Sequence, residues 1–107
     1  MKIILYQSDY NGEQRAILTK CRNMKFDASR LTPYIDCFKM RLAYLAYKNG
    51  DDITRYLKDF NHDQLHEIRL GMMMKVDVSQ YADTKLLAED MYLKRISLED
   101  KEILNKA

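Results

Sequence analysis

A pattern of residues recurs along this chain every 25 positions, and this period constrains the fold more than any other feature of the sequence. The segment Tyr10–Gln14 resembles Phe60–Gln64, and Ile35–Lys39 lies halfway between them. A second pattern has Asp, a small or branched apolar residue, Ser or Thr, any residue, and then Tyr or Leu. A fixed period of this length is typical of tandem units that stack, since one unit cannot bury its own apolar face.

The first part of each unit carries the signals of a helix start. Asn11, Asp36 and Asn61 occupy the same position of the repeat, and these residue types cap helix N-termini well. In the first and third units a Gln follows three residues later, where its side chain can complete a capping box. Long helices are therefore predicted to begin near residues 11, 33 to 36 and 61. The second start stays open, because Pro33 also suits the first turn of a helix.

The second part of each unit carries the second pattern, which predicts a turn and a very short helix. Its Asp is again a good N-cap and stands at Asp27, Asp52 and Asp77. Within each long helix a small residue recurs, as expected where a neighbouring helix packs closely against the backbone. The four residues at this position are Cys21, Ala46, Gly71 and, one place late, Ser97.

The last copy of the repeat is the least regular. It begins one residue late, so that its helix is predicted to start near residues 87 to 89. The segment Ser97–Asp100 then resembles a further capping box, with Ser97 as the cap. This pattern predicts a separate terminal helix over residues 98 to 106.

The whole chain, residues 1–107, is expected to form one all-α domain of about four units, either an α-solenoid-like array or a compact bundle. Apolar residues make up 47% of the sequence and charged residues 32%, with three Gly and one Pro, which favours a helix-rich fold. Strands are expected nowhere except over residues 2 to 6.

The environment of the protein is indicated by what the sequence contains few of. The longest apolar run near the start, Ile3–Tyr6, is too short for a signal-peptide core or a membrane span. We therefore expect a cytoplasmic protein that does not enter a membrane. Cys21 and Cys37 match no CxxC pattern and are expected to be free thiols.

One part of the chain resembles a known repeat. The segments Gln64–Gly71 and Val76–Asp83 are similar to tandem runs in uncharacterised proteins from phages and conjugative elements of Gram-positive gut bacteria. The match covers roughly residues 60 to 85, and it departs from the family pattern at Met72–Met74 and at Thr84. The resemblance implies a helical repeat encoded by a mobile element. It implies no activity, and it assigns no functional residue.

Tyrosines beside basic residues are the best candidates for partner contacts, because Tyr and Arg are enriched at binding hot spots. Tyr44 lies near Arg41 and Lys48 in the second unit and forms the leading cluster. The other candidate contact residues are Arg15, Arg22 and Tyr10.

Charge is distributed unevenly along the chain. Residues 1–50 carry nine Lys or Arg against four Asp or Glu, a net charge of +5, and residues 51–107 carry nine against twelve, a net charge of −3. The basic half could meet phosphates of a nucleic acid. An ordinary solvated surface with chance asymmetry is the favoured explanation of the same distribution.

No catalytic motif is evident, and no cofactor or metal is implied. His62 and His66 have the i, i+4 spacing of metal ligands on a helix, but no third ligand is evident, and a solvated helix start is the favoured explanation. The leading hypothesis is a non-catalytic module that binds a larger protein, as an accessory or inhibitor protein of a phage or mobile element. An anti-CRISPR-type inhibitor is one version. The alternative is a nucleic-acid-binding accessory protein that uses its basic N-terminal half. The oligomeric state is left open.

Overall fold

The computed structural model describes residues 9–24 and 30–106, with side chains described as far as residue 101. Over these residues every element of regular secondary structure is a helix. The elements are α1 (Gly12–Asn23), α2 (Cys37–Lys48), η3 (Thr54–Tyr56), α3 (His62–Met73), η4 (Val78–Gln80) and α4 (Ala88–Lys106). The strand considered for residues 2 to 6 and the short helix expected after Asp27 lie outside the described residues.

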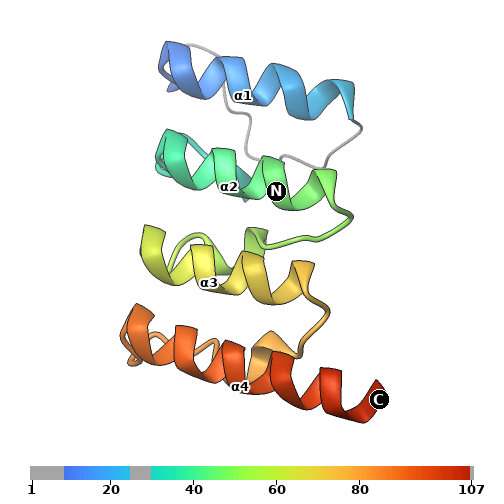
Figure 1. Cartoon of the computed structure of the whole chain (residues 1–107). Coiled ribbons are helices and arrows are strands. Elements are labelled where there is room, and N and C mark those ends of the chain that lie inside the picture. Colours follow the sequence, from blue (N-terminus) through green and yellow to red (C-terminus); the bar gives the residue numbers. More distant parts are fainter. Residues whose placement is uncertain (1–8, 25–29, 107) are drawn as a thin grey trace, which may run out of the picture.

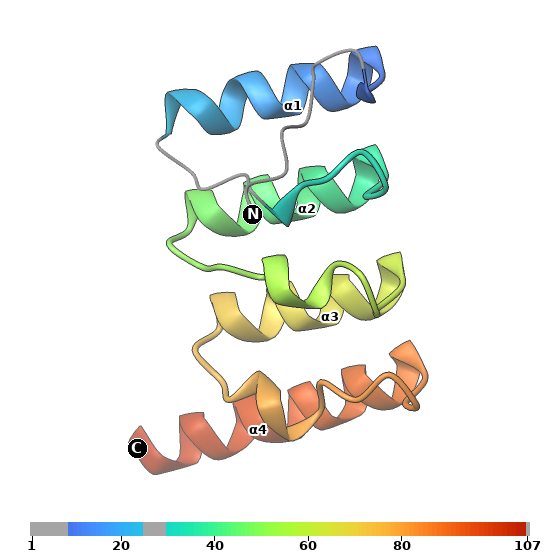
Figure 2. The same cartoon turned by 180° about the vertical axis from the view of Figure 1, so that it is seen from behind.

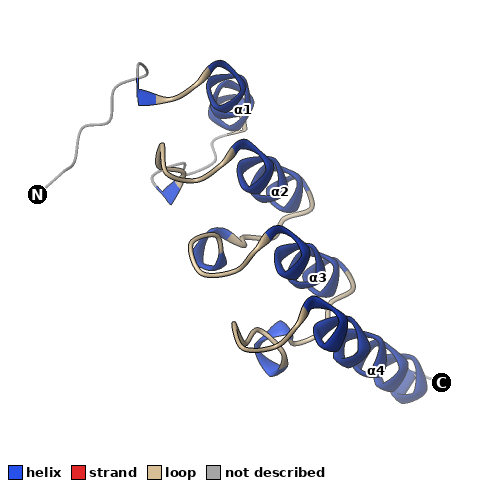
Figure 3. Ribbon diagram, turned by 90° about the vertical axis from the view of Figure 1, so that its left-hand side faces the viewer, coloured by secondary structure: helices blue, strands red, loops and turns tan. Residues whose placement is uncertain are grey.

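The four long helices form a single-file stack in which all run in the same direction (Figure 1). Each packs against the next, α1 on α2, α2 on α3 and α3 on α4. The short 3-10 helices and the connecting loops form a second layer along one side of this stack (Figure 3). The view from behind shows this layer in front of the long helices (Figure 2). The molecule is elongated, 50 × 28 × 27 Å, and the expected all-α array of repeated units is confirmed.

Capping interactions start the long helices where the sequence predicts. The Asn11 side chain accepts a hydrogen bond from the Gln14 N–H at 2.8 Å, and the Gln14 side chain accepts one from the Asn11 N–H at 2.8 Å. Asn61 and Gln64 repeat this capping box at the start of α3. Asp36 caps α2, so this helix starts at Cys37 and not at Pro33.

The Gln residues of the capping boxes also join neighbouring units. The Gln14 carboxamide donates to the carbonyls of Pro33 and Ile35, at 3.1 and 2.7 Å, in the loop that leads into α2. Gln64 makes the equivalent bonds to Thr84 and Leu86, before α4. In the second unit Lys39 takes this position, and its ammonium donates to the Leu57 carbonyl at 2.8 Å. A polar side chain therefore spans every junction between long helices; Gln14 and Gln64 are buried, and Lys39 is partly buried.

The core runs along the seam between the two layers. The long helices contribute Ile17, Met40, Leu65 and Ile68, and the second layer contributes Leu31, Ile53, Leu57, Val78 and Tyr81, all buried. The residues just before the caps, Tyr10, Ile35 and Phe60, are buried in the same cluster. Burial of these apolar side chains is the main driving force for stacking, because each unit alone would leave them in water.

The small position of α3, Gly71, packs against the short helix of its own unit, and not against a neighbouring long helix as expected. A Cβ added at Gly71 would lie 1.9 Å from the Tyr81 hydroxyl and 2.7 Å from Val78 Cγ1, both from the η4 segment of the same unit. Cys21, Ala46 and Gly71 are buried, whereas Ser97 is exposed. No short helix follows α4 within the described residues, which explains the exposure of Ser97.

The terminal segment differs from its prediction. Residues 98 to 106 do not form a separate helix, because α4 continues without a break from Ala88 to Lys106. Arg95 bonds Glu99 at 2.6 Å across the predicted boundary, and it bonds Glu67 of α3 at 2.8 Å. No Gly or Pro interrupts this segment. An i, i+4 ion pair and packing of Leu98 against the core stabilise the continuous helix.

Candidate partner-binding surface

A groove lies between the first two long helices. It is lined by Glu13, Ala16, Ile17 and Lys20 of α1 and by Cys37, Phe38 and Arg41 of α2, and its volume is about 310 Å³. We call it the α1–α2 groove. The side chain of Phe38 is 64% exposed, which is unusual for a large apolar residue. The groove therefore offers an apolar contact at the start of α2 and two cations further along.

Tyr44 lies between two lysines. The ammonium of Lys20 on α1 is 5.8 Å from the centre of the Tyr44 ring, and the ammonium of Lys48 is 5.6 Å from it. Both distances are within the range of cation–π interactions. Because Lys20 also lines the α1–α2 groove, it joins this cluster to Arg41. The structure thus brings Tyr44, Arg41 and Lys48 into one region, as the sequence predicts, with Lys20 as the link.

A single carboxylate lines the α1–α2 groove, and it already has a hydrogen-bond donor. The Cys37 thiol donates to Glu13 at 3.0 Å, across the start of the two helices. This hydrogen bond, together with the negative charge of Glu13, raises the pKa of the Cys37 thiol. The thiol therefore stays protonated as a donor at neutral pH, and the groove holds two cations, Lys20 and Arg41, against the one negative charge of Glu13.

The other predicted contact residues lie elsewhere. Tyr10 is buried, and its hydroxyl donates to the Leu31 carbonyl at 2.8 Å, so it belongs to the core and is not a surface contact. Arg15 is exposed, with one guanidinium N–H on the Tyr10 carbonyl at 3.1 Å. Arg15 and Arg22 are seven residues apart and share a face of α1 that lies roughly 140° around the helix from Lys20. The basic residues of α1 do not form one continuous stripe.

The start of α3 contacts the start of α2 through His62. Its Nε2 lies 2.9 and 3.0 Å from the two oxygens of Asp36, and its ring packs on Phe38 at 5.7 Å between centroids. Burial alone would raise the pKa of Asp36, but the hydrogen bonds from Lys39 and His62 outweigh it and lower that pKa. Among the described residues no group of three or more His, Cys, Asp and Glu is arranged to hold a metal ion. His62 thus has a structural contact between units.

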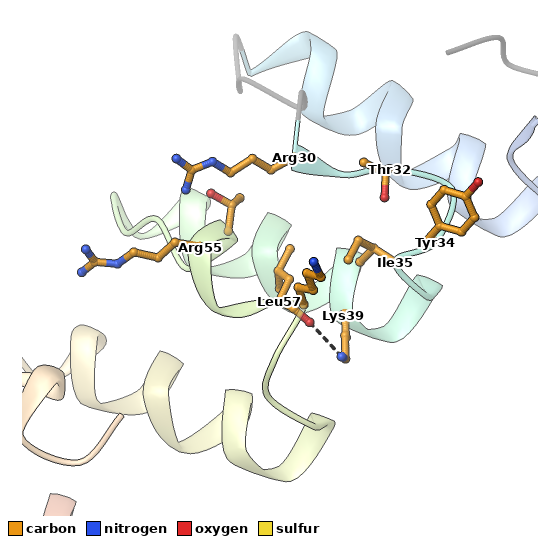
Figure 4. A pocket seen from close by; sticks show the side chains of 9 residues that line it. Arg30, Thr32, Tyr34, Ile35, Lys39, Arg55 and Leu57 are labelled. Carbon is orange, nitrogen blue, oxygen red and sulfur yellow. Dashed lines mark hydrogen bonds between the residues drawn. The ribbon is translucent and has the colours of Figure 1, made fainter. Parts of the chain in front are cut away.

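A larger hollow opens in the layer of short helices. Its volume is about 740 Å³, and we call it the η3 hollow (Figure 4). Four basic residues line it, and no acidic residue does. The lining residues are Arg30, Thr32, Tyr34, Ile35, Lys39, Thr54, Arg55, Leu57 and Lys58.

Sequence reasoning did not single out the residues that complete these two sites. Lys20 was one of several basic residues on the first helix, and Phe38 had no motif to mark it. Arg30 and Arg55 did carry a signal, because they occupy the same position of the 25-residue repeat in adjacent units. That position accepts any residue in the repeat pattern, so two identical arginines there pointed to a surface and not to the core.

Comparisons of the chain with protein-family models, with curated proteins and with solved structures found no match. In the part of the chain that the structure describes, no helix combines the length and the apolar character that crossing a membrane requires.

Proposed function

We propose that this protein is a non-catalytic binding module that holds an acidic segment of a larger protein in the α1–α2 groove. The observation that carries the proposal is the cluster of Lys20, Tyr44 and Lys48 beside Arg41, since an aromatic residue among cations suits a partner with carboxylates. Exposed Phe38 supplies an apolar anchor point at the other end.

The distribution of basic residues favours a protein partner over a nucleic acid. A duplex needs cations that follow its phosphates along one face. Here Lys20, Arg41 and Lys48 gather between α1 and α2, whereas Arg30 and Arg55 lie in the layer of short helices. An array of stacked helices with separate local patches suits contacts with a folded protein. Consistent with the resemblance over residues 60 to 85, we propose an accessory or inhibitor protein of a phage or mobile element. An anti-CRISPR-type inhibitor is one such case.

The test compares two tyrosine variants in affinity capture followed by calorimetry with the captured partner. Tyr44→Ala is expected to weaken partner binding by about tenfold or more, because aromatic anchors dominate hot spots. Tyr92→Ala is the control, since Tyr92 is a half-exposed tyrosine of α4 with an arginine against its ring, far along the array. Thermal unfolding of both variants separates a loss of binding from a loss of fold.

Charge reversal and nuclease treatment distinguish the two partner classes. Arg41→Glu should weaken binding to an acidic protein, and the complex should survive nuclease. A partner lost after nuclease, together with tight and steeply salt-dependent binding of bare DNA or RNA, contradicts the proposal and favours the nucleic-acid alternative.

A further inference from the structure

The η3 hollow has the composition of a site for a small anion. Its lining combines four cations, Arg30, Lys39, Arg55 and Lys58, with three hydroxyl-bearing residues and an apolar floor of Ile35 and Leu57. Its volume of about 740 Å³ lies in the usual range of small-molecule sites, roughly 300–1,000 Å³. It is formed by the second layer and the start of α2, so it is separate from the α1–α2 groove.

Two guanidiniums define one end of the hollow. Arg30 and Arg55 extend toward the same side, as Figure 4 shows, and they stand at equivalent positions of adjacent units. Burial alone would raise the pKa of nearby Asp52, but hydrogen bonds from Thr54 and the charges of Arg30 and Arg55 outweigh it and lower that pKa. Asp52 Oδ1 already accepts the Thr54 N–H and hydroxyl, at 2.9 and 2.6 Å. Asp52 therefore supplies one negative charge beside the two arginines, and no carboxylate belongs to the lining of the hollow itself.

The middle and far end of the hollow offer different contacts. The Lys39 ammonium gives one N–H to the Leu57 carbonyl at 2.8 Å, and an ammonium has three N–H donors. Tyr34 stands at the end away from the arginines, and its side chain is 93% exposed. An exposed aromatic ring is a stacking platform for a planar group, and nucleobases use such platforms regardless of their sequence.

We propose that the η3 hollow binds a nucleotide, with its phosphates between Arg30 and Arg55 and its base against Tyr34. Guanidinium groups match phosphate oxygens in a bidentate geometry, and Lys39 neutralises further charge from the middle of the hollow. Because Arg30 and Arg55 come from adjacent units, each guanidinium can contact a different phosphate of a linked pair. The same chemistry is present in a free nucleoside diphosphate and in a single-stranded nucleic acid.

The experiment titrates the full chain with ADP, inorganic pyrophosphate and a short single-stranded DNA at one fixed ionic strength, by calorimetry. Arg55→Gln copies Gln80, the residue of the next unit at the same position. It is expected to weaken ADP binding by about tenfold or more, the effect of losing a charge-assisted hydrogen bond. The control Lys94→Gln removes one positive charge from exposed α4 and should leave the affinity unchanged. Thermal unfolding shows whether each variant keeps its fold.

Tyr34→Ala tests the other end. It is expected to weaken ADP binding while leaving pyrophosphate binding unchanged, because only ADP carries a base. An affinity for the single strand above that for ADP, with the same loss in Arg55→Gln, identifies the strand as the source of the nucleotide, and the reverse order identifies a free nucleotide. The proposal is overturned if neither ADP nor the strand binds, if Lys94→Gln weakens binding as much as Arg55→Gln does, or if Tyr34→Ala affects ADP and pyrophosphate equally.

Discussion

The two central units of the array, α2 with η3 and α3 with η4, have the same backbone arrangement but fill it with different side chains. At the small position the α2 unit has Ala46 and the α3 unit has Gly71. At the aromatic position both have a tyrosine. Tyr81 is fully buried, with its hydroxyl on the Glu67 carbonyl at 2.7 Å, whereas Tyr56 is only partly buried. The unit that carries the extra methyl group, on Ala46, has a partly exposed tyrosine, whereas the unit with Gly71 has a buried one.

The Tyr56 ring has neighbours of its own, Phe60 and Arg55. Its ring packs edge-on against Phe60 at 5.6 Å between centroids, and the Arg55 guanidinium stacks over it at 4.9 Å. In the unit of α1 the small position holds Cys21 and the aromatic position holds Leu31, and both are fully buried. The three units thus hold three different pairs at these positions, Cys with Leu, Ala with a partly buried Tyr, and Gly with a buried Tyr.

The helix ends of the two units also differ in sequence but share one motif. After α2 the N–H groups of Gly50 and Asp51 bond the carbonyls of Tyr47 and Ala46, and Gly50 has φ +84°. After α3 the equivalent bonds are made by Lys75 and Val76. Lys75 adopts φ 64°, a left-handed conformation that costs a residue with a Cβ free energy. The α3 unit therefore carries backbone strain that the α2 unit avoids.

The largest expected effect comes from changing the pair in the α3 unit. Gly71→Cys should lower the free energy of unfolding by about 2–3 kcal/mol, because the added atoms occupy the space of the Tyr81 ring. Adding Tyr81→Leu to this variant copies the pair of the first unit and should restore part of the loss. Urea denaturation of the two single variants and the double variant measures the coupling. Additive effects would contradict the exchange of space between these two positions.

A smaller effect is expected from Tyr81→Phe, which removes the hydrogen bond to Glu67. Its loss should cost about 1 kcal/mol at neutral pH. Burial raises the pKa of Tyr81 well above its usual value. The positive charge of Arg95 lowers this pKa and the negative charge of Glu67 raises it, but burial is the largest cause. The folded protein then keeps the proton while the unfolded chain loses it above about pH 10, so the stability contributed by Tyr81 falls as the pH rises through that value.

The measurement for this prediction is the free energy of unfolding from about pH 8 to about pH 11, a range that includes the usual tyrosine pKa. Tyr81→Phe should decline less steeply at alkaline pH than the parent chain. Tyr56→Phe serves as the matched control in the adjacent unit, where the ring is partly exposed. Identical alkaline slopes for the parent and Tyr81→Phe would show that burial of this hydroxyl has no thermodynamic consequence.

The smallest effect concerns the helix end. Lys75→Gly copies Gly50 and should raise the stability by roughly 0.5 kcal/mol, since relief of the left-handed strain is partly offset by the greater freedom of Gly in the unfolded chain. Gly50→Lys should lower it by about 1 kcal/mol. Urea midpoints of both variants check the pair. A change of the same sign in both would mean that side-chain contacts, and not backbone conformation, decide these positions.

Much of the fold could be predicted from the sequence because the signals for helix starts are local. Asn11, Asp36 and Asn61 mark helix starts through bonds that span three residues, and all three starts are confirmed. The separate helix predicted from Ser97 was wrong, because a capping residue can also lie within a helix when tertiary contacts continue it. Arg95 makes such a contact to Glu67, 28 residues away, and no local pattern indicates it.

The candidate sites were less predictable. The cluster of Tyr44 with Lys48 follows from helical spacing, but Lys20 reaches the ring from another helix. Tyr10 resembled a contact residue by type, and only its position between the layers shows that it is buried. Arg30 and Arg55 were not singled out from the sequence although the period makes them equivalent, because the hollow that they line depends on how the loops of two units lie together.

By itself, the sequence determined the period, the helix starts and the all-α stack, because capping and apolar spacing act over a few residues. The tertiary structure decided which layer each small residue faces, whether a tyrosine lies inside or outside its unit, and where cations from different units meet. These features depend on contacts between units, and a period of 25 residues specifies which positions are equivalent without specifying how their side chains share the space between them.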